Sequence, residues 1–243
     1  EDAELSKDGM INDGIIATKL GLQGIPISAE LLIIERDLTL LEYNNCRYHI
    51  AQISSVNSVD IIKERKNKVN FSCGVSINNL SLNENDIGDF KTFLKLSPPL
   101  RTEADRNALV QGLNDETIDV IVSDHKPEDE ENKRLTFAQA ETGASGIETL
   151  LPLSLELYHN GSVELETIIK ALTSKPAEIL KINKGNLSIG NAADFCIVDI
   201  NKPWVVKKEK LISKSKNTPI EDKKLQGKVI STFVNGEELF KSE

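Results

Sequence analysis

The chain has 243 residues, of which 39% are hydrophobic and 28% are charged, and its formal net charge is −9. This composition is typical of a folded globular protein with one large domain, or one domain and a small appendage. An acidic chain with dispersed lysines offers no basic patch. That excludes general binding to nucleic acid or to an anionic membrane surface and favours a small-molecule or protein partner.

The three cysteines, Cys46, Cys73 and Cys196, are odd in number and show no CxxC spacing. This pattern argues against a disulfide framework or a thiolate metal site and predicts a reducing, cytoplasmic location. The sequence has no run of about 18 apolar residues that would predict a membrane span, and no recognisable signal peptide. Because the first residues lack an initiator Met, we expect a piece of a longer chain.

Strand-like and helix-like segments alternate in the first part of the chain. Residues 21–41 predict a helix that begins at Ala29 with Ser28 as its N-cap. The β-prone run 47–54 and the amphipathic run 54–68 predict a strand followed by a helix.

The same alternation continues further along the chain. The sequence predicts a strand over 69–77, a polar loop over 78–89, a helix over 104–115 and a strand over 117–124. Strands that alternate with helices indicate a parallel sheet, whose ligands bind at the carboxyl ends of the strands.

The last part of the chain changes in texture. Two helices are predicted from Gly146 to Tyr158 and from Val163 to Leu172, and Pro176 opens a further helical turn. Beyond about residue 184, short β-prone runs separated by turn signals such as Val-Asn-Gly predict a β-rich appendage.

Asp124 and His125 end the strand predicted over 117–124. Taken alone, the pair is equally compatible with an Asp that caps the strand exit beside a solvated His. The surrounding pattern is more specific, because SDHKP at 123–127 is followed by AETGASGIETLLPL at 140–153.

A longer series carries the family resemblance. In chain order it reads GLQGIPISAE, RYHIAQISS, LSPPLR, IDVIVSDHKP, GIETLLPL, SKPAEIL, GNLSIGNAADFCIVD and LQGKV. This series resembles the dihydroorotase family of cyclic amidohydrolases, metal-dependent enzymes of pyrimidine biosynthesis that interconvert dihydroorotate and carbamoyl aspartate. The resemblance covers nearly the whole chain.

The resemblance implies an α/β fold. Residues 1–183 are expected to form the C-terminal part of a TIM-type (β/α)8 metal-dependent hydrolase barrel, and residues 184–243 a small β domain. We expect the chain to start around the fourth barrel strand, without the first-strand HxH motif that supplies two metal ligands in the family.

Hydrolysis of an unactivated cyclic amide needs an activated water and a polarised carbonyl. Zinc supplies both, because it lowers the pKa of its bound water to about 7 and acts as a Lewis acid. The resemblance implies that Asp124 is both a metal ligand and the group that shuttles the proton from that water to the leaving nitrogen.

Two ligand positions depart from the family pattern. Gln52 stands where the second His of HxxHxS binds metal, and Asn79 stands where a His precedes LxL. Their neutral amide oxygens are poor zinc donors, so we expect one zinc ion or none. Glu128 replaces a loop His that helps to hold substrate, and its charge would repel a dicarboxylate.

Further candidates each have a structural alternative. Asn78 is a candidate substrate ligand, or a turn residue. Gly143 is expected to present backbone groups to a ring amide, or to serve a tight loop. Asp2 matches an acidic fourth-strand position that binds metal in some relatives, or is an exposed terminal carboxylate.

Three other residues are given structural roles. We expect His49 to be a packed or hydrogen-bonded core histidine. His159 is expected to act as a dipole partner at the end of its helix. Arg101 is expected to be a salt-bridging structural residue in preference to a substrate clamp.

Two functional hypotheses follow. The first is a dihydroorotase-type hydrolase with Asp124 as its base. The second is a scaffold subunit with the same fold and no catalysis, for example for aspartate transcarbamoylase. Three barrel strands are recognisable where closure needs about eight, so either further chain or a second copy, as in a homodimer, is expected to cover the open sheet.

Overall fold

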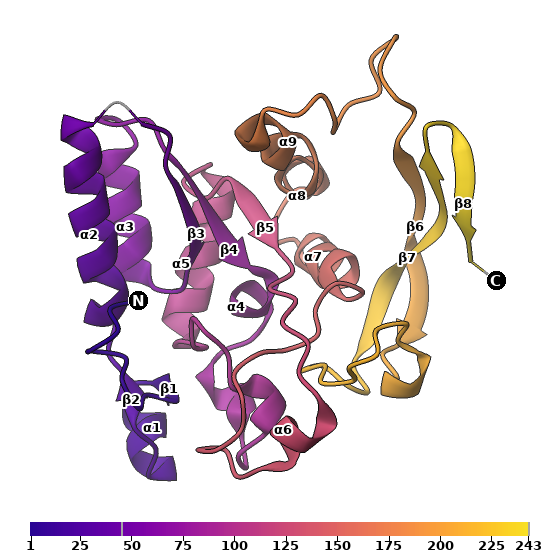
Figure 1. Cartoon of the computed structure of the whole chain (residues 1–243). Coiled ribbons are helices and arrows are strands. Elements are labelled where there is room, and N and C mark those ends of the chain that lie inside the picture. The colour runs from indigo at the N-terminus through magenta and orange to yellow at the C-terminus, as the bar shows by residue number, and fades with distance from the viewer. Residues whose placement is uncertain (45, 243) are drawn as a thin grey trace.

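The computed structural model describes residues 1–44 and 46–242. Its central sheet has three parallel strands in the order β3-β4-β5 (Figure 1). These strands are β3 (His49–Ile53), β4 (Ser72–Ser76) and β5 (Val120–Val122). The predicted α/β class is confirmed, and of the expected barrel the described residues form a part.

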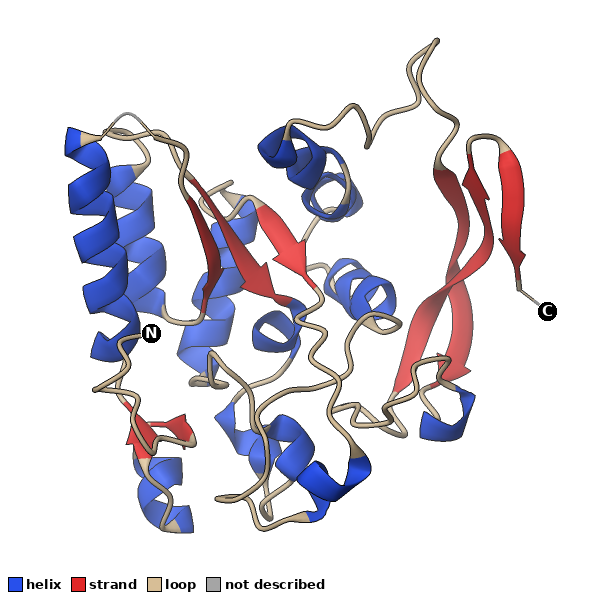
Figure 2. Cartoon of the chain, in the orientation of Figure 1, coloured by secondary structure: helices blue, strands red, loops and turns tan. Residues whose placement is uncertain are grey.

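Three helices, one before β3 and one after each of β3 and β4, cover one side of the sheet (Figure 2). They are α2 (Ser28–Tyr43), α3 (Val56–Arg65) and α5 (Glu103–Asn114). Their apolar stripes and the sheet share one core, which includes the fully buried side chains of Leu38, Ile53, Ile62, Leu109 and Leu113. Burial of each such side chain stabilises the fold by about 1.5–3 kcal/mol.

Local caps fix where two of these helices begin. Ser55 accepts a hydrogen bond from the Ser58 amide (3.2 Å) at the start of α3, and Thr102 forms a capping box with Asp105 at the start of α5. The prediction for Ser28 is wrong, because Ser28 is already helical and makes no side-chain cap. Backbone amides at the start of α2 instead donate to carbonyls of the preceding turn.

The prediction of a polar loop over 78–89 is also wrong. This stretch contains α4 (Ile77–Ser81) and the short helix η1 (Glu84–Ile87). Ser76 caps the first through the Asn78 amide (3.2 Å), and Asn83 caps the second. The Asn and Asp residues that mimic a coil therefore act as caps, while apolar residues between them are buried.

Several short elements were not expected from the sequence. They are β1 (Ile11–Asn12), α1 (Ile15–Leu20), β2 (Gly24–Ile25), η2 (Thr92–Leu94), α6 (Glu130–Arg134) and η3 (Lys208–Lys210). Strands β1 and β2 pair in parallel as a separate ribbon.

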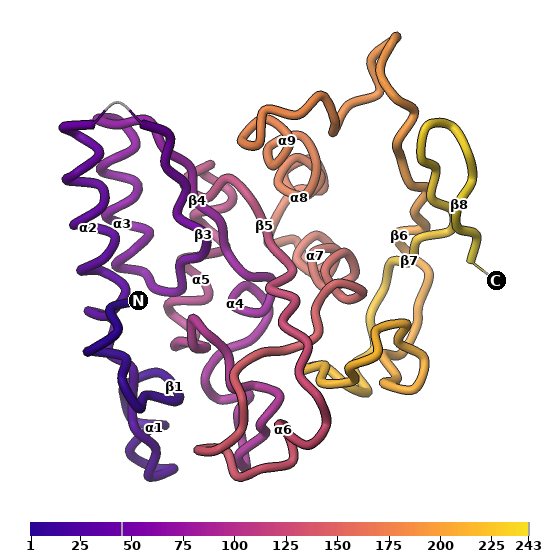
Figure 3. The backbone as a smooth tube through the Cα atoms, in the orientation of Figure 1, coloured from indigo at the N-terminus to yellow at the C-terminus, as the bar shows by residue number. Residues whose placement is uncertain are grey.

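The C-terminal part adds three helices and a second sheet. The helices are α7 (Leu150–His159), α8 (Leu165–Leu172) and α9 (Ser174–Leu180), and the strands are β6 (Phe195–Val205), β7 (Lys224–Val234) and β8 (Glu237–Lys241). Figure 3 shows the helices between the two sheets. The second sheet is antiparallel, and the Val-Asn-Gly turn is confirmed by positive φ values of 51° at Asn235 and 81° at Gly236.

The second sheet is fastened to α7. Gly227, with φ +101°, lies so close to Leu155 that an added Cβ would be 2.3 Å from the Leu155 Cδ1. Lys223 forms an ion pair with Glu156 at 2.7 Å. In the part of the chain that the structure describes, no helix is both long and apolar enough to cross a membrane.

Candidate functional site

Asp124 lies directly beyond the carboxyl end of β5. Its φ of +47° is in the left-handed region, which costs a residue with a Cβ about 1–2 kcal/mol. This conformation turns the chain out of the sheet at the strand end. Non-glycine residues held in this way occur preferentially at functional sites.

Three side chains from the neighbouring strand ends converge on the Asp124 carboxylate. Gln52 of β3 donates from Nε2 to Oδ1 at 3.0 Å, and Ser76 of β4 donates from Oγ to Oδ2 at 3.4 Å. Asn78 of α4 is close enough for its amide to lower the pKa of Asp124, although its Nδ2 has no partner at normal hydrogen-bond length. The structure thus brings together three predicted site residues, Asp124, Gln52 and Asn78. It adds Ser76, which was not predicted, although its position at the end of a predicted strand could have marked it as a site residue.

Burial raises the pKa of Asp124 above its ordinary value. The hydrogen bonds from Gln52 and Ser76 oppose this effect, because they favour the charged carboxylate. The result is a partly buried carboxyl group with a pKa closer to neutrality than that of an exposed Asp, which suits a group that must both accept and release a proton.

His125 is held by the loop that returns past the strand end. Its Nδ1 accepts from the amides of Gly146 (3.2 Å) and Ile147 (3.4 Å), which places the proton of a neutral ring on Nε2. The backbone of His125 also forms a parallel bridge with Ala144. Gly146 is required here because an added Cβ would lie 2.2 Å from the Ser123 carbonyl oxygen.

Glu128 and Gly143 lie in the loops that follow β5, and the backbone of each makes hydrogen bonds to other parts of the chain. The Glu128 side chain is 17% exposed and lies 4.0 Å from the Lys126 ammonium, so its charge is partly countered. Gly143 donates its amide to the Lys95 carbonyl (2.9 Å) and accepts from Asn217 (3.1 Å). Both backbone groups of Gly143 are therefore already engaged within the protein.

Asn79 and Asp2 make contacts elsewhere. Asn79 is 3% exposed and donates from Nδ2 to the Pro99 carbonyl at 3.0 Å. Asp2 accepts from the amides of Glu4 (3.1 Å) and Leu5 (3.0 Å) and so caps a local turn. Neither makes a hydrogen bond to Asp124.

A buried polar network beneath the site went unrecognised in the sequence. Arg101 is 2% exposed and donates to Ser54 Oγ (3.1 Å), to Asn12 Oδ1 (2.9 Å) and to the Ile25 carbonyl (2.6 Å). These hydrogen bonds use the donors of the Arg101 guanidinium, whose Nη2 also lies 3.5 Å from Glu1 Oε1. The structural role expected for Arg101 agrees with this geometry.

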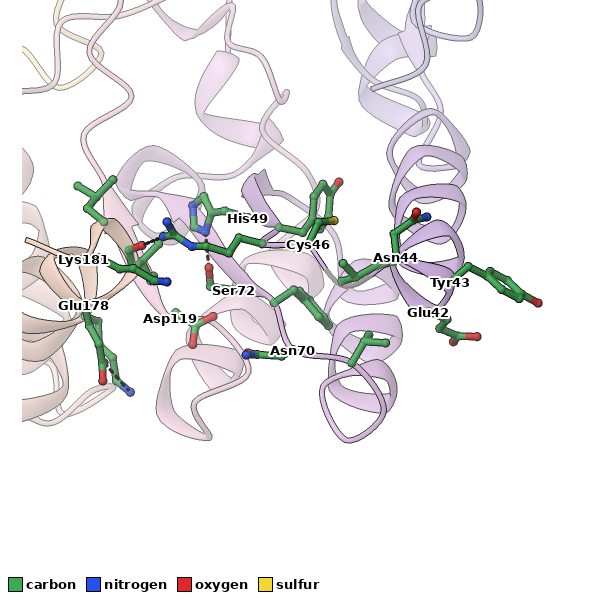
Figure 4. A pocket seen from close by; sticks show the side chains of 18 residues that line it. Glu42, Tyr43, Asn44, Cys46, His49, Asn70, Ser72, Asp119, Glu178 and Lys181 are labelled. Atoms are coloured by element: carbon green, nitrogen blue, oxygen red, sulfur yellow. Dashed lines mark hydrogen bonds and ion pairs between the residues drawn. The ribbon is translucent and has the colours of Figure 1, made fainter.

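A separate groove of about 1070 Å³ lies at the amino ends of the sheet strands, opposite Asp124 (Figure 4). His49 faces Ser72 there, with Nδ1 2.8 Å from the Ser72 Oγ. The prediction of a core position for His49 is wrong, because the residue is exposed in this groove, whereas the expected hydrogen bond is present.

His159 also differs from its expected role. Its Nε2 lies 2.9 Å from the carbonyl oxygen of Ile200 in β6. The ring therefore joins α7 to the second sheet, and the last carbonyls of its own helix are not its partners.

The fold and the strand-end site define a class of protein that the sequence comparisons identify. A model of the amidohydrolase family matches residues 19–239, and the chain belongs to this family. It is 43% identical over 238 residues to a dihydroorotase of Ehrlichia canis (strain Jake), an alignment that covers 97% of this chain and 53% of the relative. A dihydroorotase of Anaplasma phagocytophilum (strain HZ) is 40% identical, with coverage of 100% and 55%.

A solved structure supports the same conclusion about the fold. L-hydantoinase (dihydropyrimidinase) from Arthrobacter aurescens matches with a TM-score of 0.87 and 25% identity, over 98% of this chain and 53% of that one. The chain spans about half the length of the curated relatives it matches. The expected resemblance to dihydroorotases is thereby confirmed, and the barrel is partial over the matched length.

Amidohydrolases are generally metal dependent, and a divalent ion needs several donor side chains around it. Among the described residues, no group of three or more His, Cys, Asp and Glu side chains is placed to hold a metal ion. At the strand ends Asp124 offers a carboxylate, and Gln52 turns its N–H toward that carboxylate. Zinc sites are built from several imidazole, thiolate or carboxylate ligands, so the residues of this chain do not by themselves fit a zinc centre.

Proposed function

We propose that this chain is part of a dihydroorotase-like hydrolase that opens a small cyclic amide, converting dihydroorotate and water to carbamoyl aspartate and back. The observation that carries the proposal is the partly buried carboxylate of Asp124 at the carboxyl end of β5, with its raised pKa and its hydrogen bonds from Gln52 and Ser76. Membership of the amidohydrolase family and the likeness to dihydroorotases support the substrate class.

In the proposed reaction Asp124 is the general base and then the general acid. It takes a proton from the water that attacks the ring carbonyl, and it returns a proton to the ring nitrogen as the C–N bond breaks. Gln52 and Ser76 orient the carboxylate. Proton transfer by a positioned group contributes about 10²–10⁴-fold to such rates.

Zinc is the cofactor that the family resemblance implies, and the proposal assigns it no ligand in this chain beyond Asp124. Asp2 is a weak ligand candidate because it is already used in its local turn. Asn78, Glu128 and Gly143 stay proposed substrate contacts. Of these, Asn78 has the best support, because its amide lies beside Asp124 with an unused donor.

The second candidate function is a non-catalytic scaffold subunit that binds a partner such as aspartate transcarbamoylase. Its support is the pair of amides, Gln52 and Asn79, at positions where ligand histidines were expected. A homodimer is a related proposal. The strands β3 and β5 are the edge strands of the three-stranded sheet, and a second copy of the chain would cover the open sheet.

Two further proposals concern organisation and location. We propose that residues 1–183 and 184–243 are separate structural units, which is supported by the exposed segment that precedes β6. A reducing, cytoplasmic setting is supported by the three unpaired cysteines, Cys46, Cys73 and Cys196.

The test is a dihydroorotate hydrolysis assay on the full-length protein. Replacing Asp124 with Asn should lower kcat/KM by about a hundredfold or more, whereas Asp60→Asn, a change at an exposed position on α3, should leave it unchanged. Absence of turnover in the wild type, together with tight binding to transcarbamoylase, would favour the scaffold function instead.

A further inference from the structure

The Asn78 side chain is a buried donor that makes no hydrogen bond of normal length. The residue is 1% exposed, and its Nδ2 has no hydrogen-bond partner among the described residues. A buried N–H left unpaired costs about 1–3 kcal/mol, and native structures rarely tolerate such groups without a reason. This amide lies beside Asp124 and lowers its pKa, but it makes no hydrogen bond of normal length to that carboxylate, so it can still donate to a molecule bound at the site.

The Asp124 carboxylate has the opposite property, because it retains unused acceptor capacity. Gln52 engages Oδ1 at 3.0 Å, and Ser76 reaches Oδ2 only at 3.4 Å. An ionised carboxylate offers about four lone-pair sites, so the group can accept at least one more donor from a ligand.

An acceptor beside a donor matches one edge of a cyclic amide. A small ring forces its amide bond to be cis, so the N–H and the C=O point to the same side. Open-chain secondary amides are almost always trans and present these two groups in opposite directions. Asp124 and Asn78 together would therefore read the N–H and the C=O of a ring amide and discriminate against its open-chain counterpart.

Gln52 occupies the position beside Asp124 where a cation would otherwise balance the negative charge of the carboxylate. Its amide is neutral and directs an N–H at Asp124 Oδ1, which satisfies that oxygen without a positive ion. A metal ion would have to displace this hydrogen bond and would find an amide oxygen in return, which is a weak donor for zinc.

We propose that Gln52 takes the place of the metal ion beside Asp124, and that this site binds the cis-amide edge of a small ring through Asp124 and Asn78 without zinc. The inference rests on the proposed function for its substrate class. It goes beyond that function in two ways. It assigns the recognition of the ring amide to the Asp124 carboxylate and the Asn78 amide, and it states that this binding needs no metal ion.

The metal arm of the test measures zinc on the full-length protein after dialysis against a chelator. Titration calorimetry with zinc chloride should show weak binding to the wild type and at least tenfold tighter binding to Gln52→His, because the imidazole restores a good donor beside Asp124. Gln52→Leu is the matched control and should not gain zinc affinity. Retention of one zinc ion per wild-type chain, or equal zinc affinity in wild type and Gln52→His, would overturn the proposal.

The ligand arm uses dihydrouracil as the probe, in the presence of the chelator. The wild type should bind it and should bind N-methylpropionamide, an open-chain secondary amide whose amide bond is trans, at least tenfold more weakly. Asn78→Ala should weaken dihydrouracil binding about tenfold, the effect of one hydrogen bond of about 1.4 kcal/mol. Asn114→Ala, which removes an exposed amide bonded to the Ser162 carbonyl, should have no effect.

Loss of dihydrouracil binding in chelator, or equal affinity for the ring and the open chain, would also overturn the proposal. Thermal unfolding provides a second readout, since Asn78→Ala should cost less stability than Asn79→Ala, which also removes the hydrogen bond to the Pro99 carbonyl. A parallel hydrolysis assay separates the two proposals. Metal-free binding without turnover upholds this inference and refutes the proposed function, whereas turnover that depends on added zinc does the reverse.

Discussion

Glu30 is the residue whose replacement should test the polar network most directly. It lies on α2 with 4% exposure. Its carboxylate accepts from the Ser54 amide (3.0 Å) and from the hydroxyls of Ser54, Ser55 and Ser58. Ser54 Oγ in turn accepts from the buried guanidinium of Arg101. Glu30→Ala would therefore leave several donors and one cation without their charged partner.

The expected loss of stability follows from these contacts. A hydrogen bond to a charged group contributes about 1.5–3 kcal/mol, but the four bonds share one carboxylate and do not add in full. Removal of one partner from a buried charge network typically costs about 3–5 kcal/mol, and we expect Glu30→Ala to fall in that range. Glu30→Gln keeps one acceptor oxygen and should lose about half as much.

The measurement is urea unfolding followed by far-ultraviolet circular dichroism, with the free energy of unfolding extrapolated to water. Glu35→Ala is the matched control, because Glu35 is exposed on the same helix, and it should change stability by less than about 0.5 kcal/mol. A loss below about 1 kcal/mol for Glu30→Ala, or a loss equal to that of the control, would refute the idea that this carboxylate organises the network.

Three further predictions concern other buried groups. Burial lowers the pKa of Lys133 from 10.5 to about 8, so the folded state binds fewer protons than the unfolded chain between these pH values. Stability should then rise across that window, and Lys133→Met should abolish the rise in urea midpoints. Burial raises the pKa of the Cys73 thiol to about 12, so a disulfide reagent at pH near 8 should modify the two exposed cysteines in the folded protein and Cys73 only in urea. Gly146→Ala should cost about 1–3 kcal/mol by overpacking against Ser123, whereas Gly14→Ala, whose added Cβ has no neighbour closer than 3.7 Å, should be near neutral in the same unfolding assay.

The strand-end arrangement was predictable because it depends on short-range patterns. The β-prone run 47–54, which contains Gln52, and the run 117–124, which ends at Asp124, identify two strands, and parallel strands place their carboxyl ends at one edge of a sheet. The contact between these two side chains follows from that rule together with their positions in the runs.

The position of Asn79 was harder to predict because it depends on a helix hidden in a polar stretch. Once residues 77–81 are helical, consecutive side chains diverge by about 100° around the axis. Asn78 then lies toward Asp124 while Asn79 turns to the Pro99 carbonyl. Reading the stretch as a loop gave no basis for separating the two.

The Glu30 network could not be predicted from sequence at all. Glu30 lies 71 positions from Arg101 along the chain, and nothing local marks the serines after β3 as its partners. Such long-range pairing is set by how α2 packs against the sheet, which is a property of the tertiary structure.

The hydrogen bond between Gln52 and Asp124 spans the full width of the central sheet, because β4 lies between the two strands that carry them. Neighbouring strands are about 4.8 Å apart, so these two backbones are separated by about 10 Å. Bridging that gap needs a long side chain at position 52. An asparagine there would carry the same chemical group and stop one methylene short of β5, so reach as well as polarity restricts which residues this position can accept.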